Sequence, residues 1–263
     1  MPDCPDHEPP AVHRPGDVGV QSFDGSDRCD CDGMADRPRA DSGGDTTVQP
    51  GPAPASLAEI LGRPVDEGMS RYVDMLATAG VERGLIGPRE IGRLWERHIL
   101  NCVVLEELIP RNATIADIGS GAGLPGIVLA LVRPDLRVTL VEPLLRRATF
   151  LSETIDMLDL GATVKVARVR AEEYRGEPFT IVTARAVAPL DRLAGLAFPM
   201  LTARGILLAV KGRRAHDEVE EHRTALTELG AGRVEVVTLG STTLAEPTTV
   251  VVIEAPAARP TAG

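Results

Sequence analysis

After Asn112, short runs of β-branched and aliphatic residues alternate with longer segments of helical pattern, and this alternation constrains the fold more than any other feature. The runs occupy residues 114–118, 137–141, 163–166, 180–183 and 205–210, and the helical segments occupy about 125–132, 144–159, 189–202 and 214–229. Strands that alternate with helices form a parallel sheet covered on both faces. The last two runs, 233–239 and 248–254, have no helix between them. They predict a C-terminal antiparallel hairpin at the edge of a mostly parallel α/β sheet.

The region before this alternating part divides in two. Residues 1–52 are rich in Asp, Pro and Gly and nearly free of aliphatic side chains, so they bury too little apolar surface to offset the entropy of ordering. We predict a disordered acidic tail there. Residues 53–110 have a helical pattern, with one apolar stripe at spacings of three and four made of Ile91, Trp95, His98, Cys102, Leu105 and Ile109. We therefore predict a helical N-terminal extension packed on a domain that spans residues 111–263.

The acidity of the chain is concentrated in the predicted tail. The net charge is −10, and residues 1–55 hold eleven acidic residues against four basic ones. Because the remainder is nearly neutral, the overall charge does not exclude a nucleic acid as partner. Aromatic residues make up only 3% of the chain, which argues against a surface that binds single strands by stacking on several rings.

The sequence favours a cytoplasmic, monomeric protein without a metal site or a membrane segment. The first thirty residues hold no apolar run of the kind that signal peptides carry, and no later run approaches the length of a membrane span. Four cysteines are too few for a disulfide scaffold in a chain of this length. Cys29 and Cys31, with His7 and His13 upstream, match no zinc-binding spacing.

The strongest local signal is a glycine-rich loop, DIGSGAGLPG, at Asp117 to Gly126. It follows a predicted strand and precedes a predicted helix. Gly119, Gly121 and Gly123 allow a tight turn and a close approach of the backbone to a ligand. The loop also satisfies the dinucleotide pattern G-x-G-x-x-G, so by itself it indicates a nucleotide-like cofactor without choosing one.

Charged residues follow the neighbouring strands of the predicted sheet. Glu142 ends the second strand and could accept both hydroxyls of an adenosine ribose, which NAD and S-adenosylmethionine share. The segment Arg170–Glu173 follows the third strand, where a carboxylate and backbone groups could bind an adenine or form a solvated loop. Arg185 and Lys211 end the fourth and fifth strands, and we expect them to converge on the ligand crevice and position an anionic or electron-rich substrate.

Three observations favour one cofactor and narrow the class of reaction. A parallel nucleotide-binding sheet that ends in an inserted antiparallel strand is the arrangement associated with Rossmann-like class I methyltransferases, not dehydrogenases. The segment Ala184–Pro189 lacks the Asn or Asp with prolines and an aromatic residue that amino methylation uses. No cysteine follows Cys102, which disfavours pyrimidine-C5 methylation through a cysteine nucleophile.

The chain resembles the RsmG (GidB) family, methyltransferases that modify guanine N7 in 16S ribosomal RNA of the small subunit. The resemblance runs from about Arg97 to Glu254 and rests on five segments in order: HILN at 98–101, the glycine loop, RAEE at 170–173, ARA at 184–186 and VKG at 210–212. It implies that S-adenosylmethionine is bound by Gly119, Leu124, Ala171, Glu172 and Arg185, with Glu142 near the ribose. It also suggests a role for His98 near the substrate cleft, although the spacing of His98 equally fits a core residue.

Guanine N7 carries an in-plane lone pair and no proton to lose, so its methylation needs no general base. We therefore expect Arg185 and Lys211 to act by positioning the guanosine or its phosphates. The alternatives are a small-molecule methyltransferase, a nicotinamide-dependent dehydrogenase that shares the glycine loop and Glu142, and a binding module without turnover.

Overall fold

The computed structural model describes residues 49–258, and these belong to one compact unit of the chain. Nearly all of the acidic tail predicted for residues 1–52 lies outside the described residues, as do Cys29, Cys31, His7 and His13. Within residues 49–258, no helix is long and apolar enough to cross a membrane.

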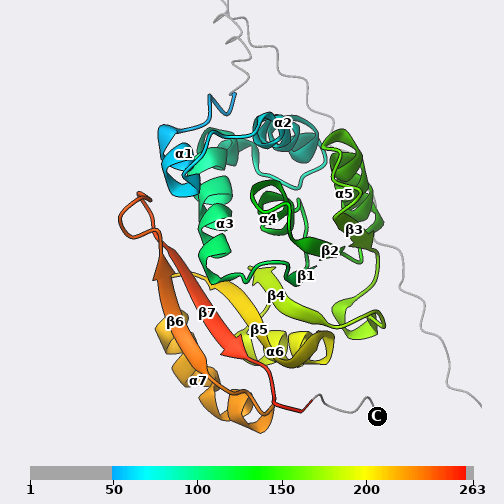
Figure 1. Cartoon of the computed structure of the whole chain (residues 1–263), viewed down its shortest axis with the longest axis vertical. Helices are drawn as coiled ribbons and strands as arrows, with labels where there is room; N and C mark the ends of the chain where they lie inside the picture. The colour runs from blue at the N-terminus through cyan, green and yellow to red at the C-terminus, as the bar shows by residue number, and fades with distance from the viewer. Residues whose placement is uncertain (1–48, 259–263) are drawn as a thin grey trace, which may run out of the picture. The chain divides into compact units, whose positions relative to one another are not determined.

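The sheet has seven strands in the order β3-β2-β1-β4-β5-β7-β6 (Figure 1). The strands are β1 (Thr114–Ile118), β2 (Arg137–Val141), β3 (Val164–Ala167), β4 (Phe179–Arg185), β5 (Leu201–Lys211), β6 (Val234–Leu239) and β7 (Thr248–Glu254). The pairs among β1 to β5 are parallel, whereas β7 runs antiparallel to both β5 and β6. The predicted Rossmann-like arrangement, with a C-terminal antiparallel hairpin, is confirmed.

Helices cover both faces of the sheet, as the alternation of strands and helices predicts (Figure 1). One face packs against α4 (Gly126–Val132), α5 (Leu145–Met157) and the N-terminal helices, and the other packs against α6 (Leu190–Ala197) and α7 (Ala215–Glu228). The predicted helix 189–202 ends early, because a short 3-10 turn, η6 (Phe198–Met200), contains Pro199, and β5 starts at Leu201.

The N-terminal extension is helical, as predicted, and most of its helices are short. They are α1 (Ala55–Leu61), α2 (Glu67–Met75), η1 (Leu76–Gly80), η2 (Pro88–Arg93), η3 (Leu94–Leu100), α3 (Asn101–Val103) and η4 (Val104–Leu108). The predicted apolar stripe runs from η2 to Ile109, the residue after η4, and is buried apart from His98, which is partly exposed.

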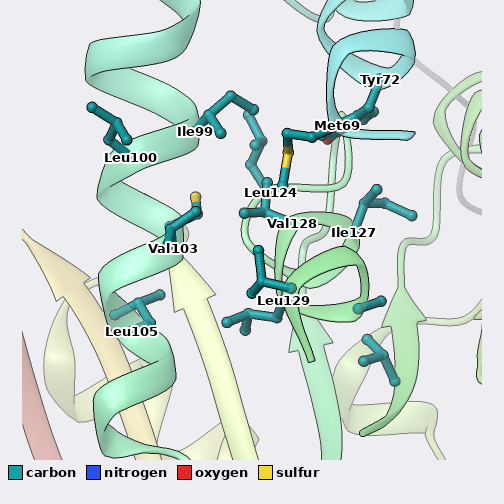
Figure 2. Close-up of a cluster of buried hydrophobic side chains, with 14 of the residues drawn as sticks. Met69, Tyr72, Ile99, Leu100, Val103, Leu105, Leu124, Ile127, Val128 and Leu129 are labelled. Carbon is teal, nitrogen blue, oxygen red and sulfur yellow. The ribbon is translucent and has the colours of Figure 1, made fainter. Parts of the chain in front are cut away.

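This extension packs directly on the element that carries the glycine loop. Figure 2 shows Ile99, Val103 and Leu105, from the consecutive elements η3, α3 and η4, across from Leu124, Val128 and Leu129 of the loop and α4. The hydroxyl of Tyr72, from α2, is fully buried and donates a hydrogen bond of 2.8 Å to the carbonyl oxygen of Ala122. The extension therefore forms one core with the loop that is predicted to bind the cofactor.

Candidate active site

The glycine loop joins β1 to α4, and Asp117 fixes both of its ends. The carboxylate of Asp117 accepts hydrogen bonds from the Gly126 backbone N–H (3.1 Å) and from the Thr183 hydroxyl on β4 (3.1 Å). Burial raises the pKa of Asp117 to about 7, because the charged form loses its hydration. Gly126 must lack a side chain, since a Cβ there would lie 2.4 Å from Leu140 Cδ2. No role for Asp117 could be predicted from local pattern, because its function depends on contacts across the sheet.

Glu142, at the end of β2, holds the middle of the same loop. Its carboxylate accepts hydrogen bonds from the backbone N–H groups of Gly121 (3.1 Å) and Leu144 (3.0 Å), and the residue is only 1% exposed. Each carboxylate oxygen has more than one acceptor position, so Glu142 keeps capacity for a ribose hydroxyl. The residue predicted as a ligand-binding group thus also has a structural function.

A cavity of about 620 Å³ lies at the carboxyl ends of β1 to β3. Four of the predicted cofactor residues line it: Gly119, Glu142, Ala171 and Glu172. Gly119 has φ +66 and lies against Val187, whose side chain forms another part of the wall. Residues from three strand ends and from η5 (Ala171–Glu173) therefore meet at one cavity, whose size and donor and acceptor groups fit an adenosine-containing cofactor.

The other predicted loop residues do not line this cavity. The Gly121 N–H is bonded to Glu142, Gly123 is buried with φ +98, and Leu124 is packed in the core against the N-terminal extension. These three residues support the conformation of the loop through contacts with the rest of the protein, not through contacts with the cavity. Sequence position alone could not separate them from Gly119, because all four belong to one motif.

Arg185 and Lys211 do not converge, contrary to expectation. Arg185 is in register with Val210, so these two side chains share the face covered by the N-terminal extension. Lys211 is the next residue on β5 and therefore points to the opposite face. There its ammonium group lies 2.7 Å from Glu218 Oε1 on α7 and donates a hydrogen bond of 2.7 Å to the carbonyl oxygen of Ala188. The alternation of side chains along a strand separates the two cations.

Arg185 reaches His98 instead. Its Nη2 lies 2.9 Å from His98 Nδ1, and His98 Nε2 lies 3.1 Å from Glu90 Oε2. His98 is therefore neither a core residue nor an isolated surface residue. It connects the helical extension to the end of β4, next to the glycine loop.

Basic and apolar side chains surround the cavity. Four arginines line it: Arg147, Arg168, Arg170 and Arg192. Leu144 (53% exposed) and Leu145 (64% exposed) follow β2 nearby. Arg147 lies 3.7 Å from the Glu142 carboxylate, whereas Arg168, Arg170 and Arg192 have no ion pair within the described residues and could contact an anionic partner such as a nucleic acid backbone.

The strand order, the inserted antiparallel strand and the glycine loop beside a ligand-sized cavity define the class I methyltransferase fold. Among solved structures, Pyrococcus horikoshii TYW2 in complex with MeSAdo shares this fold with a TM-score of 0.50 and 13% identity, covering 61% of this chain and 63% of that one. The chain belongs to the family described as rRNA small subunit methyltransferase G (GidB), which matches residues 66–245.

Curated relatives agree with this assignment. The chain is 57% identical over 182 residues to ribosomal RNA small subunit methyltransferase G of Renibacterium salmoninarum, covering 69% of this chain and 85% of the relative. It is 52% identical over 205 residues to the protein of the same name from Streptomyces avermitilis, covering 77% and 85%. It is 50% identical over 219 residues to the Mycolicibacterium gilvum protein of that name, covering 81% of this chain and 95% of the relative.

Proposed function

We propose that this protein transfers a methyl group from S-adenosyl-L-methionine to N7 of a guanine in 16S ribosomal RNA of the small subunit. The observation that carries the proposal is the meeting of Gly119, Glu142, Ala171 and Glu172 at one cavity in a member of this family. The rRNA substrate follows the names of the relatives and agrees with the arginines around the cavity. The reaction would take place in the cytoplasm, where bacterial ribosomes are.

The residues present fit the cofactor. Glu142 would accept hydrogen bonds from the ribose, the η5 segment with Glu172 would contact the adenine, and the backbone at Gly119 would allow close approach. When bound, the cofactor supplies an electrophilic methyl group on a sulfonium. The buried Asp117 and Glu142 carboxylates keep the loop in one conformation, so the site is formed before the ligand binds.

The protein works mainly by alignment. Guanine N7 offers its lone pair directly and releases no proton, so no general base is required. Holding two reacting groups in line at near-attack distance can lower a barrier by roughly 7–11 kcal/mol. In this scheme Arg185 positions the target nucleotide from the end of β4, whereas Lys211 acts on the loop between β4 and α6.

The decisive experiment is to map N7-methylguanosine in 16S rRNA from cells with and without the protein, and to repeat the reaction with purified protein. Unmodified small subunits and naked 16S rRNA are offered side by side with the labelled cofactor. We expect one modified guanine in at least one of these substrates. Calorimetry with S-adenosylhomocysteine and NAD separates this function from that of a dehydrogenase. Cofactor binding without methylation of either RNA would favour a small-molecule substrate or a binding module.

A further inference from the structure

Glu90, His98 and Arg185 form a chain of side chains that links the helical extension to the end of β4. Glu90 comes from η2 and His98 from η3, and the His98 side chain is 16% exposed. Arg185 ends β4 directly beside β1, because Ala184 is in register with Ile118. The guanidinium is therefore held next to the glycine loop by His98, which lies 87 positions away in the sequence.

The two hydrogen bonds of His98 determine which ring nitrogen carries its proton. A guanidinium has only donors, so His98 Nδ1 must carry a lone pair and accept from Arg185 Nη2. The proton then sits on Nε2, which donates to the Glu90 carboxylate. Burial and the positive charge of Arg185 both lower the pKa of His98, and Arg97 acts in the same direction against the opposing effect of Glu90. Neutral His98 is thus the form that the surroundings favour.

An imidazole orients Arg185 without cancelling its charge. Other arginines of the described chain bond to a carboxylate, which offsets their charge. Examples are Arg133 with Asp135 and Arg83 with Glu153. Within residues 49–258, Arg185 has no carboxylate within 4 Å, and its hydrogen bond to His98 uses one of five donors. The remaining donors are available to a ligand, and the charge is shared only at longer range with the buried Asp117, whose pKa the guanidinium lowers against the larger effect of burial.

We propose that His98 is the positioning residue for Arg185, which it orients through a neutral imidazole so that the guanidinium binds a phosphate oxygen of the target nucleotide. This inference rests on the proposed function. A phosphate is favoured over the N7 edge of the base because methyl transfer leaves the guanine ring with a positive charge, which a neighbouring guanidinium would repel. A phosphate stays anionic throughout the reaction and matches the forked donors of arginine.

The test is a double-mutant cycle read out as RNA affinity in the absence of cofactor. His98→Phe removes the acceptor, and His98→Asn keeps an oxygen close to the position of Nδ1. We expect His98→Phe and Arg185→Met each to weaken binding to unmodified small subunits by about tenfold, with a matching rise in KM and little change in kcat. We expect His98→Asn to stay within about threefold of the parent protein. In the Arg185→Met background, His98→Phe should have no further effect, because its action passes through Arg185.

Two controls keep the result interpretable. Thermal unfolding of every variant should match that of the parent protein, which shows that the fold is intact. A loss of S-adenosylhomocysteine affinity in Arg185→Met as large as its loss of RNA affinity would assign the guanidinium to the cofactor and overturn the phosphate contact. Additive losses in the double variant, or a loss in His98→Asn as large as in His98→Phe, would overturn the positioning role. A parent protein that binds subunits but does not methylate them would refute the proposed function while leaving this binding cycle measurable.

Discussion

The ammonium nitrogen of Lys211 lies 2.7 Å from Glu218 Oε1, and the same oxygen accepts a hydrogen bond of 3.1 Å from the Leu190 backbone N–H at the start of α6. Lys211 also bonds to the carbonyl of Ala188. Together these contacts hold the loop between β4 and α6, whose Val187 lies against Gly119.

Lys211→Met should therefore weaken S-adenosylhomocysteine binding, by about tenfold if the loop loses one charge-assisted hydrogen bond of 1.5–3 kcal/mol. RNA affinity should change by less than about twofold, because the ammonium is committed to Glu218 and Ala188. Lys165→Met is the matched control, since Lys165 is the other lysine of the chain and is exposed on β3. A large loss of RNA affinity in Lys211→Met alone would restore the direct substrate role expected from sequence.

Asp117 should make stability depend on pH in an unusual direction. Its pKa rises from 3.8 to about 7 on folding, so the folded state holds its proton more tightly than the unfolded state. The stabilisation from this group is complete below pH 3.8 and is lost as pH rises through about 7, a change of up to about 4 kcal/mol. Asp117→Asn cannot titrate, so its free energy of unfolding should lack this decline. Urea titrations of both proteins between pH 4 and 8 measure the difference, and parallel curves would contradict the assignment.

Gly126→Ala should destabilise the protein by about 1–3 kcal/mol, because the added Cβ would collide with Leu140 and Asp117. Gly195→Ala is the matched control in α6, where a Cβ meets nothing within 4 Å. It should stabilise the protein by about 0.5–1 kcal/mol, because alanine is the better helix former. Thermal melts of the two variants should therefore shift in opposite directions, and equal shifts would be the contrary result.

Glu142→Gln and Glu172→Gln should separate the two functions of the cavity carboxylates. The amide at position 142 can no longer accept from both Gly121 and Leu144, so this variant should lose about 1–3 kcal/mol of stability and also bind S-adenosylhomocysteine more weakly. Glu172 is exposed, so its variant should keep its stability within about 0.5 kcal/mol and lose only ligand affinity. Calorimetry and urea unfolding on the same samples test both statements.

The salt dependence of RNA binding should depend on the arginines at the cavity. Binding affinity is plotted as its logarithm against the logarithm of the salt concentration. Removing Arg168 and Arg192 together should reduce the steepness of this slope by about 1.4–1.8. Each phosphate contact contributes about 0.7 to the slope on single strands and about 0.9 on duplexes. Arg223→Ala is the control, because Arg223 already pairs with Glu220 on α7. An unchanged slope in the double variant would exclude phosphate contacts at this rim.

Much of the fold follows from local pattern. The spacing of apolar residues and the positions of turn-forming residues predict the strands and most helices. The absence of a helix between the last two strands predicts the antiparallel hairpin. The early end of α6 depended on Pro199, whose effect on an otherwise helical pattern is only partly local.

The site was less accessible to sequence reasoning. Gly119, Glu142, Ala171 and Glu172 line one cavity, as expected for residues that follow parallel strands, because the carboxyl ends of such strands share one edge. Their binding of the cofactor stays a prediction. Local pattern could not show that Arg185 and Lys211 face opposite sides, which depends on the register between β4 and β5. The link between His98 and Arg185 is also a tertiary contact, and no local signal encodes it.

The hydrogen bond from Tyr72 to Ala122 has a consequence for how such a chain can vary. The Tyr72 hydroxyl, on a helix that precedes the cofactor domain, donates to the backbone of the loop that would hold the cofactor, so the positions of these two segments depend on each other. Shortening or shifting α2 would change the shape of the glycine loop without altering any residue in it. The length of the chain between α2 and β1 is therefore under the same constraint as the loop motif itself.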